Sequence, residues 1–270
     1  MFSSFMTNTW IVASIVAVTA GIIGFFVVIR GSSFAAHALP LCTFPGAAAA
    51  NLFGINQLLG LILFAGLGVA GISQLGRGQR SDVATALTFV MLLGLGSLFL
   101  SLSREYSESV YSLLFGEVLG ISTAEIAPVA AISAVVVVAT LLLFRPLLLS
   151  SVSEELGEVR GISSKGLELI FLTILALATA TALPVVGALL VFSLMVGPAS
   201  AARSLTDRPF LAMLLSVAIA LVTVWMAIAL SYTSDWPVGF FVGGLSAICY
   251  GAGRSYAWAR NAQPIEIGGN

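Results

Sequence analysis

Charged residues are scarce in this 270-residue chain: 9% of it is Asp, Glu, Lys or Arg, whereas 59% is hydrophobic. A soluble domain carries about 25% charged and about 45–50% apolar residues, so these charges are too few to cover a surface that faces water. Eleven basic residues against twelve acidic ones provide no basic surface for nucleic-acid phosphates. The composition therefore excludes an ordinary soluble enzyme and a nucleic-acid-binding protein, and it indicates a polytopic integral membrane protein.

Residue types that carry chemistry are also rare. The single histidine excludes a multi-histidine zinc cage within one chain. The single lysine, Lys165, lies in GISSKG, which does not form the phosphate-binding motif G-x-x-x-x-G-K-[ST]. The two cysteines, Cys42 and Cys249, lie in apolar stretches and are predicted to be packing residues. The first ten residues lack Lys and Arg, so we expect the first apolar segment to remain as a membrane span.

Apolar segments of membrane-spanning length fill most of the chain. A span needs about 20 mostly apolar residues. The sequence predicts an all-α polytopic membrane protein with eight or nine transmembrane helices, at about 10–29, 35–54, 56–75, 83–102, 126–144, 167–183, 185–202, 210–231 and 238–253.

Two of these segments are irregular. Pro40 and Pro45 interrupt the second, which is expected to be broken or shortened. Residues 167–202 would be about 54 Å long as a single helix, longer than a bilayer core of about 30 Å. We therefore predict a break near Pro184 and Gly187.

The positive charges predict an orientation. Cytoplasmic loops are enriched in Lys and Arg, and an external N-terminus with nine spans places ten of the eleven basic residues inside. The insert 147–166 is then cytoplasmic, the tail 254–270 is cytoplasmic, and the loop 103–125 is external. External acids would attract cations or a basic partner, unless they only solvate the loops; they are Glu105, Glu108, Glu117, Glu125 and Asp235.

Two further features are candidates for function. Glu154 and Glu155 lie in a short predicted helix that Gly161 ends, and this helix either docks into a soluble partner or is a solvated linker. His37 and Cys42 lie in an otherwise apolar segment, where polar groups usually face the protein interior or a wet path. Both are competent ligands for a transition metal, although they are five residues apart. The alternative is a packed histidine and a packed cysteine.

Three segments occur in an informative order: FAAHALPLCTFPGAAAA at 34–50, LFRPLLLSSVSEELGEVRGI at 143–162 and VGALLVFSLMVGPASAARSL at 186–205. Together they resemble the membrane subunit of bacterial ABC importers for zinc, manganese and related metals. That family carries a segment like Gly-Asp-Ala-Leu-Ser-His-Ala-Val-Leu-Pro-Gly, then a cytoplasmic coupling segment, then a stretch with Val-Gly-x-Leu-Leu-Val and Pro-Ala-x-x-Ala-Arg. Alignment on Pro45 and Gly46 puts His37 where the family usually has Asp, and Leu41 where it usually has His.

The resemblance implies one transmembrane permease domain over 1–253, in the bacterial plasma membrane. Such a permease is not itself an enzyme and holds no cofactor; it translocates a divalent metal ion, zinc or manganese, by alternating access. The implied partners are a cytoplasmic ABC ATPase, which Glu154, Glu155 and Gly161 would contact, an extracytoplasmic metal-binding protein, a second copy of the chain and membrane lipid. His37, with Cys42 as the weaker candidate, would contact the ion.

Two other functions remain open. A permease for a metal chelate such as haem, siderophore or cobalamin would need a wide pathway. A stand-alone secondary transporter should show inverted repeats and intramembrane carboxylates.

Overall fold

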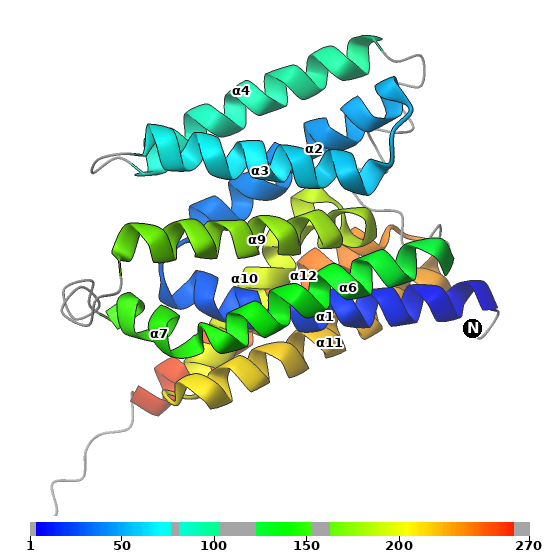
Figure 1. Ribbon diagram of the computed structural model, residues 1–270. Helices are drawn as coiled ribbons and strands as arrows, with labels where there is room; N and C mark the ends of the chain where they lie inside the picture. Colours follow the sequence, from blue (N-terminus) through cyan, green and yellow to red (C-terminus); the bar gives the residue numbers. More distant parts are fainter. Residues whose placement is uncertain (1–3, 77–80, 103–122, 153–162, 262–270) are drawn as a thin grey trace, which may run out of the picture.

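The computed structural model describes residues 4–76, 81–102, 123–152 and 163–261, and every regular element in these ranges is an α-helix (Figure 1). Nine helices of 18 to 26 residues occupy the nine apolar segments that the sequence predicts. They are α1 Ser4–Ile29, α2 Ser33–Phe53, α3 Gln57–Leu75, α4 Ser81–Leu102, α6 Thr123–Leu142, α9 Ser164–Val186, α10 Ala188–Leu205, α11 Pro209–Ser234 and α12 Val238–Asn261. Within the described ranges, one further and shorter helix, α7 Phe144–Val152, was not predicted. The all-α prediction is therefore confirmed.

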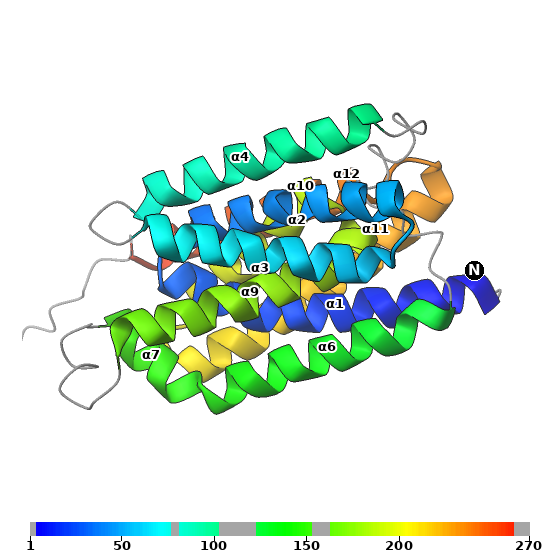
Figure 2. The same ribbon diagram turned by 45° about the horizontal axis from the view of Figure 1, so that its top comes forward.

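The nine long helices run alternately in opposite directions between two ends of the bundle (Figures 1 and 2). We call the end that holds α7 and the last turn of α12 the inner end, and the opposite one the outer end. Every basic residue that the described ranges contain lies at the inner end: Arg30, Arg145, Lys165, Arg203, Arg208, Arg254 and Arg260. This distribution agrees with the predicted orientation, in which the inner end faces the cytoplasm.

Six helices in the described ranges are long and apolar enough to cross a membrane: α1, α3, α4, α6, α9 and α11. The less apolar helices α2, α10 and α12 run between the same two ends. Helix α2 can be less apolar because it is enclosed by other helices and not by lipid. It contacts α3, α4, α9 and α10.

The second apolar segment differs from its prediction. It is one continuous helix, α2, that contains both Pro40 and Pro45 and ends at Gly54 in a left-handed conformation with φ of 65°. Proline removes a helical hydrogen bond, but neighbouring helices can hold a transmembrane helix together despite this loss. Every residue from Ala38 to Ala50 is buried, so this packing surrounds both prolines.

The predicted break between residues 167 and 202 is confirmed at Gly187. This residue ends α9 and begins α10, with φ of 85° and ψ of 151°. Side chains rarely adopt this conformation, which glycine reaches without steric strain. The chain therefore reverses direction at the outer end without a polar loop, and Pro184 lies inside the last turn of α9.

Close backbone contacts divide the bundle into two tightly packed groups. In the first, α2 meets α3 where Gly46 faces Gly60, and a Cβ on Gly46 would lie 2.1 Å from the Gly60 carbonyl oxygen. In the second, α1 meets α10 where a Cβ on Gly24 would lie 2.0 Å from the Met195 carbonyl oxygen. The first group consists of α2, α3 and α4, the second of α1, α10, α11 and α12, and α9 contacts helices of both. The buried core of the second group includes Phe25, Phe26, Leu194 and Met195, and Phe171 of α9 packs into the same core.

Burial is uneven among the helices. Of the most apolar stretch in each helix, 72% is buried in α1 and 67% in α9, against 22% in α6. Leucines and valines on the outward faces of α3, α4 and α6 are exposed. These faces fit contact with lipid, because in a bilayer an apolar surface needs no cover.

Candidate functional site

Helices α2, α9 and α10 meet around the segment that carries the predicted ligands His37 and Cys42. Helix α2 starts at the inner end and is buried from Ala38 onward, between α3 and α4 on one side and α9 and α10 on the other. Because α2 lies at the boundary between the two packed groups, its side chains are in contact with both of them. A relative movement of the groups would therefore act directly on α2.

His37 lies one turn into α2 and is partly buried. Its imidazole packs against the Phe192 ring of α10, with 5.3 Å between the ring centroids and 81° between the ring planes. This contact crosses from the first packed group to the second. The side chain is neither in open solvent nor enclosed in the apolar core, which is compatible with transient binding of an ion.

Cys42 is fully buried in α2 and lies against α3, where a Cβ on Gly68 would be 3.1 Å from the Cys42 Cβ. At about 100° per residue, five residues place Cys42 and His37 on different faces of the helix. The structure does not bring the two predicted ligands together. Leu41, one turn from His37, lies in an apolar cluster with Leu183 of α9 and Ala188 of α10.

Within the described residues, no group of three or more His, Cys, Asp or Glu side chains could hold a metal ion. His37 is therefore a single candidate ligand in one copy of the chain. A weak site of this kind suits passage of an ion better than storage, because a complete ligand cage would hold the ion.

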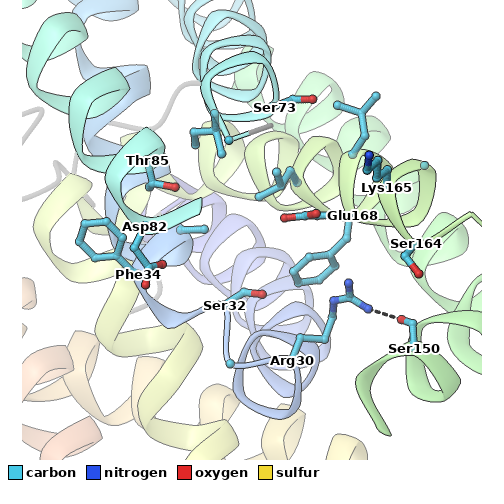
Figure 3. A pocket seen from close by; sticks show the side chains of 18 residues that line it. Arg30, Ser32, Phe34, Ser73, Asp82, Thr85, Ser150, Ser164, Lys165 and Glu168 are labelled. Carbon is cyan, nitrogen blue, oxygen red and sulfur yellow. Dashed lines mark hydrogen bonds between the residues drawn. The ribbon is translucent and has the colours of Figure 1, made fainter. Parts of the chain in front are cut away.

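A cavity of about 790 Å³ opens at the inner end, close to the start of α2 (Figure 3). The ends of α1, α2, α3, α4, α7 and α9 line it. Phe34 and Ala35 on the first turn of α2 belong to the lining, whereas His37 does not. Ala35 in the cavity wall is two residues from His37 along α2.

The cavity wall carries both signs of charge. Arg30 and Lys165 supply positive charge, and Asp82 and Glu168 supply negative charge. The hydroxyl groups that line it belong to Ser32, Ser73, Thr85, Ser150 and Ser164, and Figure 3 shows several of them around the opening. A wall with this chemistry can accommodate a hydrated ion without replacing its water shell.

Arg30 connects this wall to α7 and α9. Its guanidinium donates to the Ser150 hydroxyl at 2.5 Å and to the Leu147 carbonyl at 3.4 Å, both on α7. The same guanidinium lies over the Phe171 ring of α9, 5.0 Å from the centroid. Charge-assisted hydrogen bonds and cation–π contacts both hold it in place.

The predicted coupling residues Glu154, Glu155 and Gly161 lie outside the described residues, as do three of the predicted outer acids, Glu105, Glu108 and Glu117. Glu125 is exposed in the first turn of α6, and Asp235 is exposed in the left-handed turn that ends α11. Both lie at the outer end.

Sequence reasoning missed the inner cavity and the role of Arg30 in its wall. Arg30 directly follows the long apolar run of α1, and as a charge at the end of a span it predicts only orientation. Its contacts with Ser150 and Phe171 join residues more than 100 positions apart, so no local signal could identify them.

Comparison with known proteins agrees with this fold. The sequence profile described as "ABC 3 transport family" matches residues 2–250. The chain is 27% identical over 248 residues to the manganese import system permease protein ScaB of Streptococcus parasanguinis. This alignment covers 91% of this chain and 88% of the relative. It is 29% identical over 208 residues to the manganese transport system membrane protein MntC of Listeria monocytogenes. That alignment covers 76% of this chain and 74% of the relative.

A solved structure has the same fold. PsaBC from Streptococcus pneumoniae, in complex with Fab, superposes with a TM-score of 0.84 at 22% sequence identity, covering 93% of this chain and 91% of that one. The fold of this chain is thus shared with that solved structure.

Proposed function

The chain belongs to the ABC 3 transport family, and from this premise we propose that it is the membrane permease of a metal-ion ABC importer, with manganese as its cargo. It is a multi-pass protein of the bacterial plasma membrane. The observation that carries the proposal is the family match over residues 2–250, which extends from α1 into α12.

Manganese is preferred over zinc because of the relatives. Two of them, ScaB and MntC, are named for manganese. The carboxylates of Asp82 and Glu168 in the inner cavity, together with water, are ligand types that suit manganese. The family match disfavours a stand-alone secondary transporter. The remaining alternative, a permease for a metal chelate, would be favoured if the protein takes up such a chelate.

The energy for transport would come from a separate ABC ATPase at the inner end, and an extracytoplasmic binding protein would deliver the metal at the outer end. The sequence supports a separate ATPase, because its only lysine lies outside a phosphate-binding motif. We further propose that two copies of the chain pair around a central pathway, as symmetric oligomers usually do. Alternating access would then expose the pathway first to the outer end and then to the inner cavity.

Within the pathway, we propose that His37 contacts the ion. Its place near the inner cavity and its partial burial support this role. In the ABC importer family that the sequence resembles, the position of Leu41 usually holds histidine, so this chain lacks one ligand there. In a homodimer, the His37 imidazoles of the two copies would replace that ligand in part.

Transport is tested with the permease, its ATPase and its binding protein reconstituted together in liposomes. We expect uptake of radioactive manganese that requires ATP and the binding protein. Competition by unlabelled zinc and iron salts then ranks the metals. Transport of a haem or siderophore complex without transport of free manganese would contradict the proposed cargo and favour a chelate permease.

The role of His37 is tested in the same assay. We expect His37→Ala to lower manganese uptake about tenfold or more, equivalent to about 1.4 kcal/mol of lost ion stabilisation, and His37→Asp to keep part of the uptake because a ligand is retained. Phe192→Leu is the control, because it removes the ring contact but leaves the imidazole. Parent-rate uptake by a folded and assembled His37→Ala variant would show that the histidine only packs.

A further inference from the structure

Arg30 contacts the chain on both sides of the segment 153–162. Helix α7 leads into this segment and α9 begins just after it, at Ser164. The predicted coupling insert, 147–166, therefore includes most of α7 and the first residues of α9. One arginine side chain at the inner end of α1 is in contact with both of these helices.

The contact with α7 consists of directed hydrogen bonds. The guanidinium of Arg30 donates to the Ser150 hydroxyl and to the Leu147 carbonyl, and the Ser150 hydroxyl itself donates to the same carbonyl at 3.1 Å. Leu147 is fully buried. A hydrogen bond from a charged donor is about twice as strong as a neutral one, so α7 is held at a defined point.

The contact with α9 is made with a ring. The Phe171 side chain is 1% exposed, and the Arg30 guanidinium lies over it, 5.0 Å from the centroid. A buried aromatic ring cannot follow a displaced arginine without a movement of its helix, because protein cores are close-packed. A shift of Arg30 would therefore be transmitted to α9.

Helix α1 is suited to receive such a movement. It is the most buried of the six apolar spans, and it contacts α6, α9, α10 and α11. A long arginine at a helix end ordinarily extends its charge into water. Arg30 is instead partly buried and turned toward α7 and α9 (Figure 3).

We propose that Arg30 is a positioning residue that transmits movement of the coupling segment to α1, so that α1, α7 and α9 are displaced as one unit. The inference rests on the proposed function, since it needs an ATPase that acts on this segment. Arg30 itself need not touch the metal or the ATPase.

The test compares Arg30→Gln, Arg30→Lys and a control, Arg254→Gln. Arg254 is an exposed arginine of α12 at the same end, so the control removes the same charge without the contacts to α7 and α9. The permease–ATPase complex is measured in nanodiscs by hydrogen–deuterium exchange, with and without ATP and vanadate. Manganese transported per ATP hydrolysed is measured in liposomes.

In the parent complex, we expect nucleotide to change the exchange of α7, α9 and the inner half of α1. In Arg30→Gln, the change persists in α7 but is lost in α1, and manganese transported per ATP falls about fivefold or more. Arg30→Lys keeps the charge without the planar fork and gives an intermediate loss. Arg254→Gln behaves as the parent.

An unaltered nucleotide response of α1 in Arg30→Gln would overturn the proposal, and so would an equal loss in Arg254→Gln. If Arg30→Gln does not assemble, Arg30→Lys decides, since it keeps the charge but loses the planar fork; an unchanged response of α1 in that variant also overturns the proposal. If the parent complex transports no manganese but shows the nucleotide response, the proposed function fails, and the exchange data alone decide the role of Arg30.

Discussion

The contact between α2 and α3 leads to a sharp prediction about stability. Gly46 and Gly60 face each other, and a Cβ built on Gly46 would lie 2.1 Å from the Gly60 carbonyl oxygen and 2.6 Å from its carbonyl carbon. An ordinary van der Waals contact of a Cβ begins at about 3.4 Å, so Gly46→Ala overlaps the partner backbone by more than 1 Å. The nearest atoms are backbone, which cannot rotate away as a flexible side chain could.

The two helices must therefore separate or the backbone must shift. Overpacking a close-packed interior by one methyl group destabilises a protein by about 1–3 kcal/mol, and we expect the upper part of this range because both contact atoms are backbone. Helix α2 also carries Pro40 and Pro45 and depends on its neighbours to remain continuous. The predicted consequence is a loss of order in α2 that extends toward His37.

The matched control is Gly66→Ala. Gly66 lies in the same helix as Gly60, and a Cβ there meets nothing within 4 Å. Replacement of a glycine within a helix by alanine is worth about 0.5–1 kcal/mol of stabilisation, so this variant should be neutral or slightly more stable.

Thermal unfolding of the purified protein in detergent, followed by tryptophan fluorescence, measures the difference. We expect Gly46→Ala to lower the Tm by several degrees and Gly66→Ala to leave it unchanged or raise it. Equal Tm values for Gly46→Ala and the parent would refute the close approach of α2 and α3.

Three other results are expected. Gly187→Ala should destabilise the protein by about 1–3 kcal/mol in the same unfolding assay, because its φ of 85° and ψ of 151° suit only glycine; an unchanged Tm would contradict the sharp turn between α9 and α10. Ser216→Ala should lower stability by about 0.5–1.5 kcal/mol, since the buried hydroxyl donates to the Gly21 carbonyl at 2.8 Å between α11 and α1; unfolding that matches the parent would argue against this bond. Neutralising the five predicted outer acids, with Glu125→Gln and Asp235→Asn among them, should lower metal uptake more at low than at high ionic strength; a salt-independent loss would indicate that these acids only solvate the loops.

Much of the helical framework followed from local properties of the chain. Apolar length predicted the nine long helices, because a segment in lipid must satisfy its backbone hydrogen bonds internally. The distribution of Lys and Arg predicted which ends of these helices lie together, and the structure groups the described basic residues as predicted. Gly187 was predicted as a break because its surroundings are too long for one span, and its backbone conformation confirms this.

Only the tertiary structure determined how these helices are combined. Pro40 and Pro45 suggested a broken segment, but packing against α3, α4, α9 and α10 keeps α2 continuous, and no local pattern reports that support. His37 and Cys42 are five residues apart in the sequence, yet one lies against α10 and the other against α3. In the sequence, Arg30 is one of eleven positive charges and nothing distinguishes it from the others. Its hydrogen bonds to α7 and its contact with Phe171 exist because the fold brings residues 30, 150 and 171 to one end of the bundle. Span length and charge are properties of short segments, whereas these contacts depend on how separate helices pack.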